Sequence, residues 1–190
     1  MPMNEAHRQL CSSEEWARTV KDRILPWALE DIELGDDVVE IGPGYGANLR
    51  LLVDLVPSLT SVEIDGATAE LLERGWGDRV RVLHADAARL PLPDATYSAV
   101  VGFTMLHHVP TDALQDRIFA EAYRVLRPGG VFAGSDSQPS RELDELHVGD
   151  IMNTVDPVEL PARLTAAGFS EPAVHLHPES GGMRFRARKA

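Results

Sequence analysis

The chain has a single cysteine, Cys11, among its 190 residues. One cysteine excludes an intrachain disulfide and a zinc site built from several cysteines, and it favours a reducing compartment. Basic residues are also scarce, since 30 Asp and Glu outnumber 18 Lys and Arg and leave a formal net charge of −12. Proteins that bind nucleic acid through its phosphates normally present a basic face, so we expect no nucleic-acid partner.

Long apolar runs are absent as well. No stretch approaches the roughly 18 consecutive apolar residues of a membrane-spanning helix, and the opening MPMNEAHRQLCSSEEW is too polar for a secretory signal. We therefore expect a cytoplasmic protein with no membrane partner. Hydrophobic residues make up 44% of the chain and charged residues 25%, which is typical of a globular domain that buries its own core.

Short β-branched runs alternate with helical patterns along most of the chain. Strands are predicted at DVVEIG, LTSVEID, RVRVLHAD, YSAVVGF, GGVFAGSD, AVHLH and MRFRARK, and helices at 47–56, 66–75, 112–126 and 157–168. This alternation predicts an α/β fold, a mostly parallel sheet with helices on both faces. Only PESGG separates the last two runs, which predicts an antiparallel hairpin because a parallel pair needs a longer crossover.

Residues 1–35 are predicted to form an N-terminal helical cap. Ser12 and Glu15 have the spacing of a capping box, and apolar residues follow at intervals of three or four. Pro26 is expected to kink or break this helix, because proline has no N–H to donate within a helix.

Residues 36–190 are predicted to form the core. Within them the polar stretch 136–156 is an insertion between a strand and the last helix. In an open α/β sheet, a segment at the carboxyl end of a strand lies over the ligand crevice, so we expect the insertion to act as a lid.

A glycine-rich turn, GPGYGA at 42–47, follows the first predicted strand and opens a helix. Glycine allows a tight turn and lets a ligand lie against bare main chain. Glu63 ends the second strand, nineteen residues after Gly44, where a carboxylate can accept hydrogen bonds from both hydroxyls of a ribose. The pattern suits any nucleoside-containing cofactor, and G-x-G-x-x-A also satisfies the dinucleotide fingerprint.

Other residues help to separate the candidate cofactors. Glu40 precedes the glycines inside the strand, where a carboxylate favours a cationic ligand over a pyrophosphate. Asp86 ends the third strand, where it can accept a hydrogen bond from an adenine amino group or simply cap the next helical turn. Tyr45, Tyr97 and Tyr123 each lack a lysine four residues on, which argues against a small NAD-dependent reductase.

Four segments of the chain resemble the motifs of class I S-adenosylmethionine-dependent methyltransferases of the small, type-11-like kind. VVEIGPGYG resembles motif I, SVEID the acidic second strand, HADAARLPLPDATYSAVV the adenine loop and fourth strand, and EAYRVLRPGGVF a late segment of the family. Together they cover about residues 36–135 in the family's order. The resemblance implies a Rossmann-like, doubly wound, seven-stranded sheet, mostly parallel with an antiparallel C-terminal hairpin, and S-adenosylmethionine as the cofactor.

The resemblance also implies which residues surround the cofactor. The glycine turn and Glu40 would surround its methionine end, Glu63 would hold the ribose, and Ile64 would lie against the adenine. The full set of expected cofactor-binding residues is Glu40, Gly42, Gly44, Gly46, Glu63, Ile64, Asp86, Ala87 and Phe103.

Family members place substrate-facing groups after the fourth strand, where this chain reads FTMLHHVP. A sulfonium methyl is already activated, so the protein has to align the acceptor, exclude water and remove a proton where the acceptor bears one. We expect His107 or His108 to take that proton, because histidine titrates near neutral pH, although a lone histidine is usually structural. No metal site is expected. The residues expected to contact the acceptor are Cys11, Trp16, Met105, His147 and Met152.

The sequence therefore predicts an enzyme that transfers a methyl group from S-adenosylmethionine to a small-molecule acceptor, as a monomer or homodimer. The acceptor atom stays open between oxygen, nitrogen, sulfur and carbon, and a protein substrate is not excluded. One alternative is a module that binds the adenosyl cofactor without turnover. A small NAD-dependent reductase is a less favoured alternative.

Overall fold

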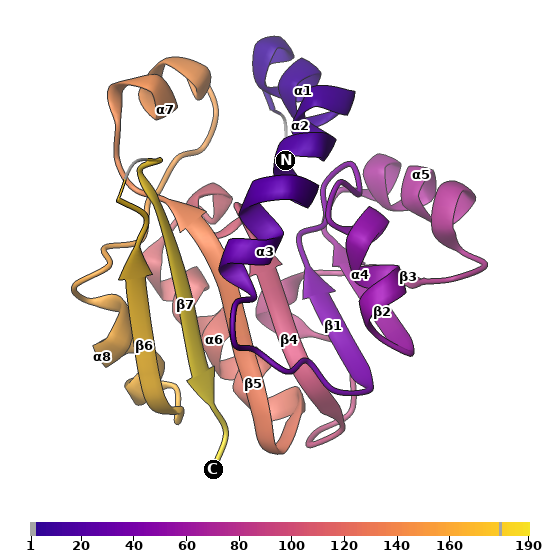
Figure 1. Ribbon diagram of the computed structural model, residues 1–190, viewed down its shortest axis with the longest axis vertical. Coiled ribbons are helices and arrows are strands. Elements are labelled where there is room, and N and C mark those ends of the chain that lie inside the picture. Colours follow the sequence, from indigo (N-terminus) through magenta and orange to yellow (C-terminus); the bar gives the residue numbers. More distant parts are fainter. Residues whose placement is uncertain (1–2, 179) are drawn as a thin grey trace.

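A computed structural model of the chain describes residues 3–178 and 180–190. Seven strands form one sheet in the order β3-β2-β1-β4-β5-β7-β6 (Figure 1). β1 to β5 pair in parallel, and β7 pairs antiparallel with both β5 and β6, which confirms the predicted sheet and terminal hairpin. The strands are β1 (Asp37–Ile41), β2 (Ser58–Glu63), β3 (Arg81–His84), β4 (Tyr97–Phe103), β5 (Leu126–Ser137), β6 (Ser170–Leu176) and β7 (Gly182–Arg188).

Helices cover both faces of the sheet. In the view of Figure 1, α3 crosses the front face and α6 lies behind it. The α-helices are α1 (Glu5–Cys11), α2 (Glu14–Thr19), α3 (Leu25–Ala28), α4 (Leu49–Leu55), α5 (Gly66–Trp76), α6 (Asp112–Val125), α7 (Arg141–Leu146) and α8 (Leu160–Ala166). A π-helical turn η1 (Val20–Ile24) joins α2 to α3, and two 3₁₀ turns are η2 (Ala87–Arg89) and η3 (Leu106–His108).

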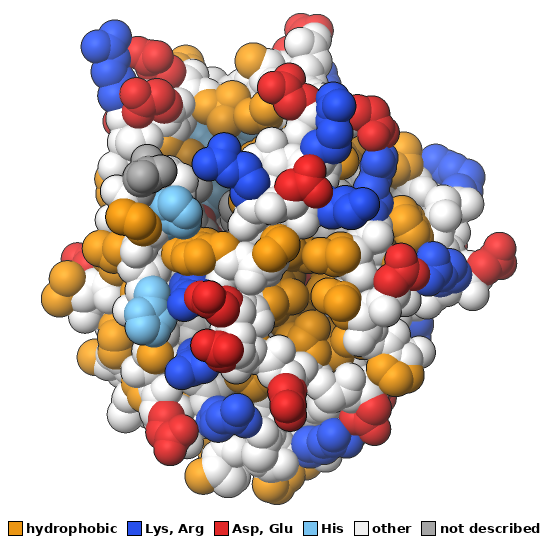
Figure 2. Space-filling model, in the orientation of Figure 1, with side chains coloured by type: hydrophobic (Ala, Val, Ile, Leu, Met, Phe, Trp, Pro, Cys, Tyr) orange, Lys and Arg blue, Asp and Glu red, His pale blue; other side chains and the backbone are white. Residues whose placement is uncertain are grey.

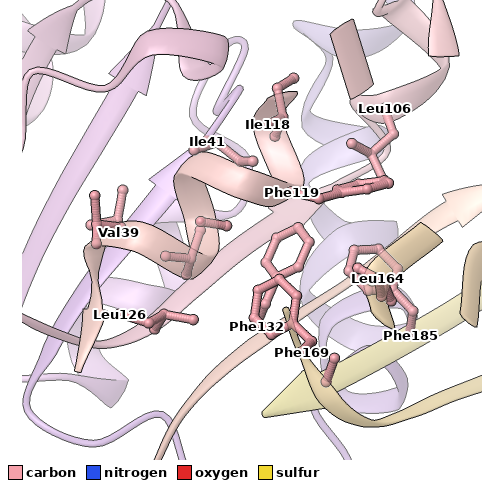
Figure 3. Packing of buried hydrophobic residues seen from close by; sticks show 14 of the residues in the cluster. Val39, Ile41, Leu106, Ile118, Phe119, Leu126, Phe132, Leu164, Phe169 and Phe185 are labelled. Carbon is pink, nitrogen blue, oxygen red and sulfur yellow. The ribbon is translucent and has the colours of Figure 1, made fainter. Parts of the chain in front are cut away.

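The central strands contribute side chains to two hydrophobic cores, because successive side chains of a strand point to opposite faces of the sheet. Val39 and Val100 point into the cluster beneath α6 and α8, where Phe119 and Phe132 pack (Figure 3). Val38 and Val101 point into the cluster beneath η1, α3, α4 and α5. Burial on both faces explains why these strands read as nearly continuous apolar runs.

The N-terminal segment differs in detail from its prediction. Ser13, rather than Ser12, caps α2, and its Oγ accepts a hydrogen bond from the Trp16 N–H. Ser12 instead ends α1, a helix that the sequence analysis did not predict and that Asn4 caps. In place of the break expected at Pro26, the helix has one turn of π-helix just before this residue. Pro26 itself lies in the first turn of α3, a position where proline is tolerated.

Two segments far apart in the sequence meet above the carboxyl ends of the strands. In Figure 1, α1 and the stretch around α7 both rise above this edge of the sheet. Asn4 joins them, because its N–H donates to Asp150 Oδ1 (2.5 Å) and its side-chain amide donates to the Leu146 carbonyl (2.6 Å). Within residues 3–178 and 180–190, no helix is long and apolar enough to cross a bilayer.

Gly134 makes a close approach between β4 and β5, the two strands that lead into η3 and the insertion. A Cβ placed on Gly134 would lie 2.0 Å from the carbonyl oxygen of Gly102, so an alanine requires the strands to move apart. We expect Gly134→Ala to lower the free energy of unfolding by about 1–3 kcal/mol, the usual range for overpacking. Urea denaturation measures this change.

Gly75, in the last turn of α5, is the matched control. No atom lies within 4 Å of a Cβ built there, and helical alanine loses less chain entropy on folding than glycine. Gly75→Ala should therefore raise the free energy of unfolding by about 0.5–1 kcal/mol. Wild-type stability in Gly134→Ala would contradict the close approach of the two strands.

Candidate functional site

The carboxyl ends of β1, β2 and β4 open into a cavity of about 760 Å³, a volume that suits a cofactor-sized ligand. The glycine turn and the strand ends form one side of the cavity, and residues of α1 and of the insertion form the other. Figure 2 shows the molecule hollowed between the two raised parts that Figure 1 labels α1 and α7, with histidine and hydrophobic side chains inside the hollow. The expected lid position of the insertion thus corresponds to one wall of this cavity.

The three glycines of the turn have different surroundings, although all have positive φ (66°, 53° and 80° at Gly42, Gly44 and Gly46). A Cβ on Gly44 would meet no atom within 4 Å, so the main chain there is open to the cavity. A Cβ on Gly42 would lie 2.9 Å from that of Met105. Gly46 does not line the cavity and instead packs near Leu72 of α5. Direct cofactor contact is therefore expected at Gly42 and Gly44 and not at Gly46.

Glu63 lies at the end of β2 and lines the cavity while being only 7% exposed. Its Oε2 accepts a hydrogen bond from the Gly44 N–H (3.2 Å), and its Oε1 accepts one from the Asp65 N–H (2.9 Å). Burial raises the pKa of Glu63. Asp65 caps α5, because its Oδ1 accepts a hydrogen bond from the Thr68 N–H. Glu63 thus holds the glycine turn in place and still presents a carboxylate to the cavity.

Glu40 is fully buried and does not line the cavity, unlike the expectation from the motif. Asn48 Nδ2 donates to its Oε1 (2.9 Å) and Ser61 Oγ donates to its Oε2 (3.0 Å). Asn48 itself lines the cavity, so Glu40 can act on a ligand through Asn48 or through its charge. The pKa of Glu40 is raised to about 7, mainly by burial and to a smaller extent by the nearby Glu63 carboxylate, while the two hydrogen bonds oppose the rise.

The expected adenine-binding residues lie together along the cavity. Asp86 is exposed and caps η2, because its Oδ1 accepts a hydrogen bond from the Ala88 N–H (2.8 Å). Ile64 is 50% exposed and offers an apolar surface to a planar ring. Phe103, at the end of β4, also lines the cavity, as does Ala87. Their contacts with a cofactor stay predictions.

Four of the five residues expected at the acceptor also line the cavity: Cys11, Trp16, Met105 and His147. Met152 does not line it. Burial, with a smaller effect of the Asp150 charge, raises the pKa of Cys11 to about 11. Its thiol is therefore protonated at neutral pH and serves as part of the wall rather than as a nucleophile.

Four histidine rings gather where α1, η3 and the insertion meet. The ring centroids of His7 and His147 lie 4.3 Å apart, those of His107 and His108 lie 4.1 Å apart, and His7 stacks on His108 at 5.0 Å. All four residues line the cavity. His7 was not among the residues expected to contact the acceptor, although it lies in the same N-terminal segment as Cys11 and Trp16, which were expected there.

The two histidines expected to act in catalysis differ in their surroundings. Asp136 holds His107 through Nδ1, and the same carboxylate accepts hydrogen bonds from the Leu106 and Ser137 N–H groups. The pKa of His108 is lowered to about 3, mainly by burial and also by the neighbouring imidazoles. His108 is therefore a weak base at neutral pH, and which of the two histidines accepts a proton stays a prediction.

Comparison with known proteins identifies the class. Residues 39–134, just over half of the chain, match the family model described as a methyltransferase domain. The chain therefore belongs to the class I S-adenosylmethionine-dependent methyltransferases. The matched range runs from β1 into β5 and includes the glycine turn, Glu63 and the loop with the two adjacent histidines.

Two relatives illustrate the similarity. The chain is 34% identical over 142 residues to a Mycolicibacterium smegmatis protein named "Probable S-adenosylmethionine-dependent methyltransferase", covering 71% of this chain and 52% of that protein. It is 31% identical over 186 residues to 27-O-demethylrifamycin SV methyltransferase of Amycolatopsis mediterranei, covering 88% of this chain and 62% of that protein. The chain thus spans between half and two thirds of the length of these relatives.

A solved structure shows the same fold. A SAM-dependent methyltransferase from Aquifex aeolicus superposes with a TM-score of 0.77 at 16% identity, and the match covers 100% of both chains. The fold is therefore that of the family over the full length of this chain.

The buried charge of Glu40 makes stability depend on pH. The pKa of Glu40 is about 7 in the folded protein, above its ordinary value of 4.5, so the folded state binds more protons between these values. The free energy of unfolding therefore falls as pH rises from 4.5 to 7, and the loss is complete above pH 7. Glutamine carries no charge, accepts from Asn48 through its Oε1, and can donate through its Nε2 to the Ser61 Oγ once that hydroxyl rotates. We expect Glu40→Gln to exceed the wild type in stability by about 2–3 kcal/mol at pH 8 and to match it near pH 4.5.

Urea denaturation at the two pH values measures this difference. Glu70→Gln, at an exposed position of α5, controls for removing one charge and should show little change at either pH. A stability gain of Glu40→Gln that is the same at both pH values would contradict the buried ionisation.

Proposed function

We propose that this chain binds S-adenosylmethionine in the cavity and transfers its methyl group to an acceptor held beneath α1 and the insertion. The observation that carries this proposal is the continuity of the cavity. It runs from the main chain of the glycine turn and Glu63, where the family's motifs lie, to the histidines and the apolar side chains of the opposite wall. Donor and acceptor can therefore occupy one enclosed space.

The placement of the cofactor follows from the charges and surfaces of the cavity. Glu63 can accept from the ribose hydroxyls through lone pairs that its two main-chain contacts leave unused. Ile64 and Ala87 offer apolar surface to the adenine. The open main chain at Gly44, with the buried Glu40 below it, suits the cationic methionine end.

The protein mainly has to align the acceptor atom with the methyl group of the cofactor. The methyl group would point from the glycine turn toward Met105 and the histidines. An acceptor atom there can approach the methyl carbon on the side opposite the sulfur, in line with the bond that breaks. α1 and the insertion exclude water from this side. His107, oriented by Asp136, is the group best placed to accept a proton from an acceptor that carries one.

A small acceptor fits the wall formed by α1 and the insertion. Leucine side chains from α1, α6 and α7 and a valine from the loop after η3 line that part of the cavity, so we expect an acceptor with an apolar body. A relative at 31% identity is named for a rifamycin substrate, which is also a small molecule. The residues concerned are Leu10, Val109, Leu114, Leu143 and Leu146.

Isothermal titration calorimetry tests the cofactor. We expect S-adenosylmethionine and S-adenosylhomocysteine each to bind at one site per chain and NADH not to bind. Binding of NADH alone would replace the proposal with the reductase alternative. Formation of S-adenosylhomocysteine from S-adenosylmethionine in a screen of hydroxylated, amino and thiol small molecules would separate turnover from binding alone.

Glu63→Ala tests the ribose contact. Removing hydrogen bonds to a charged group should weaken S-adenosylhomocysteine binding by about 1–3 kcal/mol, or roughly 5- to 150-fold. Glu70→Ala, exposed on α5 and outside the cavity, is the matched control and should bind as the wild type does. Unchanged affinity in a folded Glu63→Ala protein would move the ribose contact to another carboxylate, Asp65 first.

A further inference from the structure

His7, His108 and His147 bring one ring nitrogen each to within 4.8 Å of one another. They come from three separate elements: α1, η3 and the residue that ends α7. We propose that these three histidines bind a divalent transition-metal ion, Zn²⁺, in the wall of the cavity opposite the glycine turn. No motif in the sequence predicts this site, because its residues are widely separated along the chain.

Two of the three imidazoles are oriented as metal ligands are. His7 Nδ1 lies 2.9 Å from Asp150 Oδ2, and both side chains are buried. Asp150 is itself held, because its Oδ1 accepts a hydrogen bond from the Asn4 N–H. A histidine whose Nδ1 donates to a carboxylate directs the lone pair of its Nε2 away from that partner, which is the usual support of a metal-binding imidazole.

His147 provides an independent observation. Its Nδ1 lies 2.8 Å from the Leu143 carbonyl oxygen, which can only accept, so Nδ1 carries the proton and Nε2 carries a lone pair. The residue is only 4% exposed, and among the described residues its Nε2 is buried with no hydrogen-bond partner. Leaving a buried acceptor unsatisfied costs stability. A metal ion bound among the three rings would take up this lone pair.

The geometry is compatible with metal binding after a small inward movement of the three rings. In a tetrahedral site with Zn–N bonds of 2.0–2.1 Å, the ligand nitrogens lie about 3.3–3.4 Å apart. The distance between any two of the three nitrogens, at most 4.8 Å here, therefore has to shorten by no more than about 1.5 Å. His7 lies on α1 and His147 in the insertion, two segments joined by hydrogen bonds of Asn4 and His7. Metal binding would therefore also hold these two segments together.

The ligand set indicates the kind of metal. Three neutral imidazoles suit Zn²⁺, Cu²⁺, Ni²⁺ or Fe²⁺, whereas Mg²⁺ and Ca²⁺ prefer oxygen ligands. Three protein ligands leave a fourth position open, as in zinc sites that bind water or a substrate atom. All three histidines line the cavity, so this position faces the space proposed for the acceptor, and an acceptor oxygen or sulfur can occupy it.

Competition with a chromogenic zinc chelator, without cofactor, measures the affinity. We expect one Zn²⁺ per chain, and each of His7→Gln, His108→Gln and His147→Gln should weaken binding at least tenfold. Asp150→Asn should weaken it about 10- to 100-fold by releasing the orientation of His7. His175→Gln, on the exposed surface of β6, is the control and should bind as the wild type does.

Co²⁺ substitution of the wild-type protein tests the coordination geometry. Strong visible absorption from four-coordinate Co²⁺, absent in His147→Gln, would support the site. Binding of less than one metal ion per chain, a weak six-coordinate spectrum, or equal Zn²⁺ affinity in wild type and His147→Gln would overturn it. S-adenosylhomocysteine titration of the same samples tests folding and the proposed function separately, since that ligand contacts none of the three histidines in the proposed arrangement.

Discussion

The parallel pairing of β1 with both β2 and β4 is the constraint on which the site depends. The chain leaves β1 toward β2 and β3 and later returns to the other side of β1 as β4, so the connections on either side turn away from each other. A crevice must then open at the carboxyl end of β1, because no connection crosses it. The glycine turn lies at this point, and the cavity extends from it.

Two carboxylates buried at this crevice oppose folding and favour ligand binding. Burial raises the pKa of Glu40 and of Glu63, which means that their ionised forms are less stable in the folded protein than in water. A cationic ligand or a pair of ribose hydroxyls would stabilise those ionised forms. The two buried carboxylates therefore lower the stability of the protein without ligand, and a bound cofactor can offset this loss. Such a loss is typical of preorganised binding sites.

Local patterns predicted the parts of the molecule that depend on neighbours in sequence. The glycine turn and the terminal hairpin each follow from a few consecutive residues, and the structure has both. The cap at Ser13 differed from the prediction because Ser12 was already used to end α1. The motif also assigned Glu40 to the ligand, but strand alternation and burial place it beneath Asn48.

The sequence predicted that the N-terminal segment, the loop after β4 and the insertion contribute residues to one site, but the contacts among the four histidine rings depend on side-chain packing between these distant segments. His7 meets His147 only because Asn4 and Asp150 join α1 to the insertion. Neither of these segments lies within the range 39–134 that matches the family. The proposed donor half of the cavity therefore lies in the range that matches the family, whereas the proposed acceptor half is built largely from segments outside that range. We infer that His7 and His147 from those segments, together with His108 from the matched range, contribute to the choice of acceptor.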